Sequence, residues 1–148
     1  MCINYYPILL TGGSGLFGTI FLKKNKKIKK NIYSPSSSVL DITNKKNTTL
    51  YLKKYKPKLI IHAAALVGIK YCEKNKLLCK KINVDGTKNV VLYAKKNNVR
   101  LIYISTDYVF DGRKGNYSEN DLPNPQSIYG KSKLSAEKIV KLLNNYLI

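Results

Sequence analysis

The sequence predicts an α/β fold, a doubly wound parallel sheet between two helical layers, from three observations. Short apolar runs alternate with longer amphipathic segments along the chain. Runs such as Leu59–Ile61 and Leu101–Ile104 lack polar alternation, which is typical of strands covered on both faces. A glycine-rich turn separates the first apolar run from the first amphipathic segment. Alternating strands and helices imply right-handed crossovers and one three-layer α/β/α domain over residues 1–148.

Each element follows from its own pattern of apolar residues. Strands are expected where a short apolar run is bounded by turn residues. They lie at Tyr6–Thr11, Asn31–Ser34, Lys58–Ala65 and Arg100–Ser105, and a last strand begins near Tyr146. Helices are expected where apolar residues recur with helical spacing. They run from Leu16 to about Lys24, from about Asn47 to Tyr55, over Tyr71–Lys74 and Leu77–Lys96, and from Ile128 to Leu143.

Composition limits the classes of function. The chain has 148 residues, 44% of them hydrophobic, which is enough for a core, and a formal net charge of +19. Clustered cations release phosphate counterions, so this charge suggests a nucleic-acid partner. Only Arg100 and Arg113 are arginines, however, and specific readers use the bidentate fork of arginine. The lysine clusters at Lys23–Lys30 and Lys53–Lys58 therefore favour a solvated surface, with weak polyanion binding as the alternative.

Cysteine usage and the N-terminus indicate a reducing cytoplasm. Cys2, Cys72 and Cys79 are odd in number and lack metal-ligand spacing, so neither a disulfide framework nor a metal site is indicated. Cys72 and Cys79 lie seven residues apart, on one face of a helix, which favours partial burial. Met1–Leu10 has no basic segment, and its apolar run is too short for a signal peptide or a membrane span.

The turn Thr11–Gly18 carries glycines at positions 12, 15 and 18. In a dinucleotide-binding Rossmann fold the first glycine permits the tight turn, the second lets the backbone approach a pyrophosphate, and the third allows close helix packing. The second strand ends at Ile32–Ser36 without an acidic residue, so the sequence does not decide between NADPH and NADH. The hydroxyl groups of Ser34 and Ser36 slightly favour NADPH. Asp41 is either an acceptor for an adenine amino group or a turn residue.

Smaller features have structural interpretations. His62, the only histidine, lies in a strand before an alanine turn, which favours packing over catalysis. Ala63–Ala65 have small side chains that would let a cofactor lie close. Asn83 is a poor helix former inside a helix, so we expect a polar contact toward the neighbouring strand end.

Two further features suggest redox chemistry at a carbonyl group. The strand that starts at Arg100 leads to Thr106 at a carboxyl edge, where open α/β sheets bind ligands. Tyr129 and Lys133 are four residues apart and share one helical face. A lysine ammonium beside the phenol is expected to lower the tyrosine pKa. Thr106 could then bind a substrate carbonyl while Tyr129 supplies a proton as hydride arrives.

Together these motifs resemble the extended short-chain dehydrogenase/reductases, and within them the dTDP-4-dehydrorhamnose reductase family. The resemblance runs through nearly the whole chain, and its most specific stretch is Ser105–Gly112. It implies an NAD(P)H-dependent reductase of a 4-keto-6-deoxy nucleotide-sugar in dTDP-L-rhamnose biosynthesis, with Thr106, Tyr129 and Lys133 as the catalytic triad. The implied cofactor-binding residues are Gly12, Gly15, Leu16, Phe17, Gly18, Asp41, Ile42, Ala63, Ala64, Ala65, Tyr129 and Lys133.

The family continues past this length with a C-terminal lobe that binds the nucleotide-sugar. We therefore expect residues 1–148 to form the NAD(P)-binding domain, with the substrate domain absent, as a fragment or a split enzyme. Its partner would be that missing half, or a second copy in a homodimer, because Leu147 and Ile148 leave an apolar edge. The alternatives are a non-catalytic subunit resembling the regulatory subunit of methionine adenosyltransferase, and another nucleotide-sugar epimerase or dehydratase.

Overall fold

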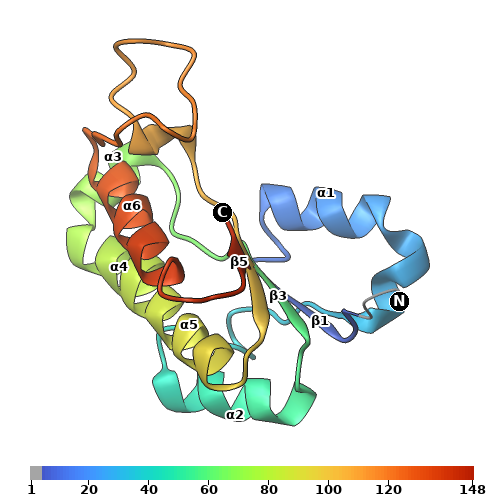
Figure 1. The fold of residues 1–148 in the computed structure, drawn as a ribbon. Helices are drawn as coiled ribbons and strands as arrows, with labels where there is room; N and C mark the ends of the chain where they lie inside the picture. Colours follow the sequence, from blue (N-terminus) through green and yellow to red (C-terminus); the bar gives the residue numbers. More distant parts are fainter. Residues whose placement is uncertain (1–4) are drawn as a thin grey trace.

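A computed structural model describes residues 5–148 and confirms the parallel sheet with helices on both faces (Figure 1). Five strands pair in the order β2-β1-β3-β4-β5, and every pairing is parallel. The strands are β1 (Ile8–Thr11), β2 (Ile32–Tyr33), β3 (Leu59–His62), β4 (Arg100–Tyr103) and β5 (Tyr146–Leu147). Each is shorter than its predicted run, because the flanking residues leave the ladder at the sheet edges. Cys2 lies outside the described residues.

The helices follow the predicted order with three changes, one of which is the short 3₁₀-helix η3 at Asp107–Val109. The predicted helix Leu77–Lys96 is divided, because a π-helical turn separates two α-helical parts. The segment after the first helix forms a 3₁₀-helix that periodicity did not predict. The helices are α1 (Leu16–Lys24), η1 (Lys26–Asn31), α2 (Lys45–Tyr55), α3 (Ile69–Lys74), α4 (Lys76–Lys80), η2 (Lys81–Gly86), α5 (Thr87–Lys96), η3 (Asp107–Val109) and α6 (Ile128–Val140).

Side-chain caps define where two helices begin. The Asn44 side chain accepts a hydrogen bond from the Asn47 backbone, so α2 starts two residues before the predicted position. The Ser127 hydroxyl accepts from the Gly130 backbone at 3.0 Å and fixes the start of α6. The predicted end of α6 at Leu143 is wrong, because the last turn after Val140 leaves the α-helix and leads to β5.

The two faces of the sheet are covered unequally. Alternation along β1 sends Leu9 into a large core formed with α2, α5 and α6. Ile8 and Leu10 point to the opposite face, where α1 and η1 supply the covering side chains. In Figure 1, α1 lies alone on its side of the sheet, whereas the other long helices lie on the opposite side. Ile102 of β4 is therefore only half-buried.

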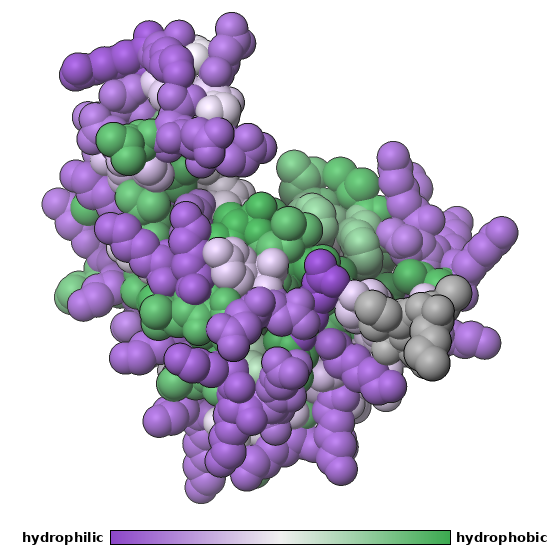
Figure 2. Space-filling view, viewed as in Figure 1, coloured by the Kyte–Doolittle hydropathy of each residue, from purple (hydrophilic) through white to green (hydrophobic). Residues whose placement is uncertain are grey.

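The surface is mostly hydrophilic, with several apolar areas, among them one over α1 (Figure 2). Leu16 is 82% exposed, and Phe17 and Ile20 are exposed beside it. Leu147 at the β5 edge is also exposed, as the sequence predicted. Within residues 5–148, no helix has both the length and the apolar composition needed to cross a bilayer.

Candidate functional site

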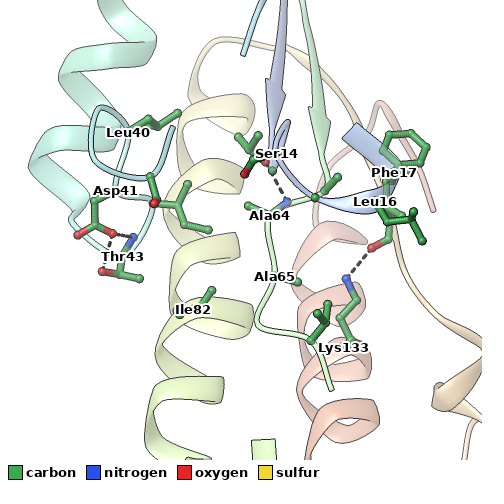
Figure 3. Close-up of a pocket in the computed structure, with 18 of the residues that line it drawn as sticks. Ser14, Leu16, Phe17, Leu40, Asp41, Thr43, Ala64, Ala65, Ile82 and Lys133 are labelled. Carbon is green, nitrogen blue, oxygen red and sulfur yellow. Dashed lines mark hydrogen bonds between the residues drawn. The ribbon is translucent and has the colours of Figure 1, made fainter. Parts of the chain in front are cut away.

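A cavity of about 690 Å³ opens at the carboxyl edge of β1, β3 and β4. Parallel α/β sheets bind ligands at this edge, because the loops after the strands diverge there. The cavity collects the glycine turn, the alanine turn and the start of α6 in one space (Figure 3). Of the residues predicted for the site, it is lined by Gly12, Gly15, Leu16, Phe17, Asp41, Ile42, Ala63, Ala64, Ala65, Tyr129 and Lys133.

The glycine turn has the geometry that the spacing predicted. Gly12 has a φ of +73°, and a Cβ there would lie 2.6 Å from the Ala63 carbonyl carbon and the Ala64 nitrogen. Gly18 does not line the cavity: a Cβ there would lie 2.4 Å from the Gly12 carbonyl oxygen, so this glycine serves packing alone. At Gly15, which precedes α1, the corresponding distance is 3.3 Å.

The N-terminus of α1 is open to an anion. No side chain caps it, and its first turn carries no acidic residue. Free backbone N–H groups and the helix dipole therefore face the cavity without an internal acceptor. This arrangement can hold a pyrophosphate.

Asp41 is a turn residue, one of the two roles left open by the sequence, and it also lines the cavity. Its Oδ1 accepts bonds from the Thr43 backbone at 2.9 Å and the Thr43 hydroxyl at 2.8 Å, which makes it a turn residue. It also lines the cavity, at the side opposite Leu16 and Phe17 in Figure 3. Its carboxylate therefore remains placed to accept a bond from a ligand.

Lys133 is almost fully buried, with 2% of its surface exposed, yet it lines the cavity. Its Nζ donates to the Ile104 carbonyl oxygen at 2.5 Å, as Figure 3 shows, and lies 4.0 Å from the centre of the Tyr103 ring. Burial lowers the pKa of Lys133 from 10.5 to about 8, and the Glu137 carboxylate opposes that shift. The amine is therefore mostly charged at neutral pH, and it loses its proton near pH 8.

The expectation that Lys133 lowers the pKa of Tyr129 is wrong for this structure. Burial raises the pKa of Tyr129, and a hydrogen bond with the Thr106 side chain opposes the rise. The physical reason is that the phenol is half-buried while the Lys133 ammonium is directed to the Ile104 carbonyl. Tyr129 is therefore a protonated phenol at neutral pH.

Thr106 lies beside Tyr129 but not in the cavity wall. Its hydroxyl donates to Asp107 at 3.1 Å and accepts from the Tyr108 backbone at 3.3 Å, so it caps η3. Tyr108 packs edge-on against Tyr129, with ring centres 6.0 Å apart. Of the three residues predicted as a triad, Tyr129 and Lys133 thus line the cavity, and Thr106 lies beside Tyr129 outside the cavity wall.

His62 is fully buried and neutral, which confirms its structural role. Its Nδ1 lies 2.6 Å from the Thr11 hydroxyl, and its Nε2 lies 3.0 Å from the Thr87 hydroxyl. Thr87 uses its own proton on the Asn83 carbonyl oxygen, so Nε2 must donate and Nδ1 must accept. Burial lowers the pKa of His62 to about 3, and the Lys133 charge adds to this.

Asn83 makes the polar contact toward a strand end that its position predicted. Its Oδ1 accepts from the Leu66 backbone at 2.7 Å, and its Nδ2 donates to the Leu66 carbonyl at 3.0 Å. The same Nδ2 donates at 2.9 Å to Ser132, whose hydroxyl donates to the Tyr129 carbonyl. Asn83 therefore ties the loop after β3 to the helix that carries Tyr129 and Lys133.

Sequence reasoning missed part of the cavity wall and one buried acid. The buried carboxylate of Glu137 accepts a hydrogen bond from Ser105, which lines the cavity. The spacing of Glu137 four residues after Lys133 was the available signal. The other wall residues outside the predicted set are Thr11, Ser14, Pro35, Ser37, Leu40, Thr43, Val67, Leu78, Lys81, Ile82 and Ile104.

Two curated proteins similar in sequence to this chain carry different names. A dTDP-4-dehydrorhamnose reductase of Aggregatibacter actinomycetemcomitans is 34% identical over 141 residues, which cover 93% of this chain and 47% of that protein. The methionine adenosyltransferase 2 subunit beta of Xenopus laevis is 34% identical over 144 residues, covering 93% and 43%. The chain thus spans about half the length of these relatives.

A solved structure gives the same result for the fold. The Bacillus anthracis dTDP-4-dehydrorhamnose reductase in complex with NADP superposes with a TM-score of 0.90 at 34% identity, over 99% of this chain and 53% of that one. The family profile described as the RmlD substrate binding domain matches residues 6–148. The protein is therefore a member of the RmlD substrate binding domain family.

Proposed function

We propose that residues 1–148 are the cofactor-binding part of an NAD(P)H-dependent reductase that acts on a 4-keto-6-deoxy nucleotide-sugar. The observation that carries the proposal is the single cavity shared by the glycine turn and by Tyr129 and Lys133. A cofactor on the turn and a proton donor on α6 would then face one reacting carbonyl group. The relatives named dTDP-4-dehydrorhamnose reductase support this substrate class.

The residues present fit a dinucleotide. The cavity volume of about 690 Å³ lies in the range of cofactor sites. The uncapped N-terminus of α1 suits a pyrophosphate, because it offers free N–H groups and no acidic side chain. The backbone at Gly12 and Ala63 approaches so closely that a Cβ at Gly12 has no room. We propose NADPH or NADH as the cofactor, and the NADP complex of the Bacillus anthracis relative supports NADPH.

The chain's own residues would bind, orient and protonate the substrate. The nicotinamide, when bound, supplies a hydride to C4 of the sugar. Tyr129 donates its phenolic proton to the carbonyl oxygen, because its raised pKa keeps that proton in place at neutral pH. Lys133 would stabilise the phenolate left behind once its ammonium turns from the Ile104 carbonyl oxygen, because both side chains project from one face of α6. Thr106 holds the carbonyl oxygen through its hydroxyl, after exchanging its bond to Asp107.

Cofactor binding is tested by a charge placed at the mouth of the cavity. Ser14 is an exposed residue of the turn before α1, so Ser14→Asp leaves the fold intact but puts a carboxylate where the pyrophosphate would bind. We expect the Kd for NADPH, measured by fluorescence titration, to rise by at least about tenfold. Ser135→Asp makes the same charge change on the exposed side of α6 and should bind as the wild type does. Absence of NADPH and NADH binding by the folded wild type would contradict the proposal.

We also propose that the substrate-binding domain lies outside residues 1–148. The chain spans 47% and 53% of two reductase relatives, which supports this division. Half-buried Ile102 and exposed Leu147 share the less covered face of the sheet, because these two residues are paired in register. The missing half, or a second copy, would cover that face. Sequencing of the reading frame after Ile148 tests the first arrangement, and sedimentation of the purified chain tests the second.

A second candidate is a regulatory subunit without catalysis. Several relatives at 31–34% identity are named methionine adenosyltransferase 2 subunit beta, and they cover 93% of this chain. Tyr129→Phe separates the candidates, because it removes only the phenolic proton. For a reductase, we expect the variant to bind NADPH normally and to lose at least about a hundredfold in turnover when assayed with the complete reading frame. An unchanged function of the variant favours the regulatory role.

A further inference from the structure

The Glu137 side chain is buried, and burying a charged carboxylate destabilises the folded protein. It is 7% exposed on the buried side of α6, and its Oε1 accepts a hydrogen bond from the Ser105 hydroxyl. A buried carboxylate with one neutral donor is poorly compensated. An opposite charge nearby is therefore required to make this burial tolerable.

The opposite charge lies one helical turn earlier. Lys133 and Glu137 are four residues apart on α6, so their side chains share a face. The two are electrostatically linked, because the Glu137 charge raises the pKa of Lys133 against the effect of burial. Ser105 connects Glu137 to the cavity, since its hydroxyl bonds the carboxylate while the residue lines the wall.

No other group surrounding Lys133 in residues 5–148 supplies this negative charge. His62 of β3 is neutral, and burial keeps the Tyr103 phenol of β4 protonated. Glu73 of α3 is engaged at the start of α6, where it accepts the Ile128 backbone N–H at 2.8 Å. Three ionisable residues on elements packed against α6 act on Tyr129: Asp107 of η3, Cys72 of α3 and Cys79 of α4. η2 and α5 also pack against α6 and carry Lys81, Asp85 and Lys88, none of which acts on the pKa of Lys133.

We propose that Glu137 is a positioning residue of this site: its buried carboxylate holds Ser105 in the cavity wall and places a negative group one helical turn from Lys133, on the same face of α6. The inference rests on the proposed reductase function for its purpose, because a charged Lys133 is what would stabilise the Tyr129 phenolate. Its geometric content is the hydrogen bond from Ser105 to the buried Glu137 carboxylate and the shared face of α6, which places Glu137 one turn after Lys133.

The test follows the titration of Lys133 directly. Protein with isotopically labelled lysine side chains is titrated by NMR, and the Lys133 signal is assigned as the one missing in Lys133→Met. Glu137→Gln keeps an acceptor for Ser105 and removes only the charge. We expect its Lys133 midpoint to fall below the wild-type value by about one pH unit or more. Glu73→Gln removes the other carboxylate that contacts α6 and should leave the midpoint unchanged.

Cofactor binding gives the second readout. Loss of the Lys133 charge should weaken NADPH binding as pH rises through the midpoint, so this weakening should begin at lower pH in Glu137→Gln. An unchanged Lys133 midpoint in a folded Glu137→Gln overturns the inference. If that variant does not fold, the shortened carboxylate of Glu137→Asp should lower the Lys133 midpoint by a smaller amount, and an unchanged midpoint there overturns the inference as well. A shifted midpoint without any NADPH binding would instead reject the proposed function alone.

Discussion

Gly15 and Gly18 belong to the same turn but differ in how much space each has for an added methyl group. A Cβ at Gly18 would lie 2.4 Å from the Gly12 carbonyl oxygen and 2.5 Å from the Gly13 Cα, so backbone would have to move. We expect Gly18→Ala to lower the free energy of unfolding by about 3 kcal/mol in urea denaturation. Gly15→Ala meets only one atom, at 3.3 Å, and should cost less than about 1 kcal/mol while weakening NADPH binding. Equal losses of stability would contradict the packing role of Gly18.

The protonation of His62 makes the free energy of unfolding depend on pH. Its pKa is about 3 in the folded chain and 6.5 when exposed, so protons bind the unfolded state first. The stability from this group is complete above pH 6.5 and is lost as pH falls toward 3. Between pH 7 and pH 5 we expect a loss of about 2 kcal/mol, which is absent in His62→Asn. The ring signals of this single histidine should stay those of the neutral Nε2–H tautomer over the same range, and a midpoint near 6.5 would refute the assignment.

Individual elements meet at the π-helical turn η2. Asn83 lies in this turn, and its side chain bonds both the loop after β3 and Ser132 of α6. Asn83→Ala leaves both half-buried backbone groups of Leu66 and the buried Ser132 hydroxyl without this partner, so we expect a loss of about 3 kcal/mol of unfolding free energy. Asn75→Ala is the matched control, because that side chain makes one exposed bond to Tyr71 and should cost less than about 1 kcal/mol. Similar losses in the two variants would mean that η2 does not hold the site together.

The charge of the whole molecule acts on stability more than on fold. A net charge of +19 on 148 residues repels itself across a compact surface, which Figure 2 shows as largely hydrophilic. Salt screens this repulsion, so the thermal unfolding midpoint without cofactor should rise by a few degrees between about 10 mM and 150 mM sodium chloride. Polyanion binding by the lysine clusters should weaken steeply over the same range. A midpoint that falls with salt would show that attractive charge pairs dominate instead.

The sequence predicted the parallel sheet and about half of the cavity wall because these depend on local patterns. Apolar runs give β1, β3 and β4, and the spacing of Gly12, Gly15 and Gly18 gives the turn. Helix bounds were less predictable. The π-helical turn and the 3₁₀-helix have no period that distinguishes them from a continuous α-helix, and the end of α6 depends on its contact with the strand that follows.

By itself the sequence determined the order of elements, the glycine turn, and the shared helical face of Tyr129 and Lys133. Only the tertiary structure decided the protonation of the site and the role of Glu137. The tyrosine pKa rises because burial outweighs a lysine that is bonded to Ile104, and no spacing along the chain encodes that balance. Ser105 and Glu137 lie 32 residues apart and meet only when β4 and α6 pack together. Short-range periodicity sets which face a side chain takes, whereas desolvation and long-range contacts set its charge.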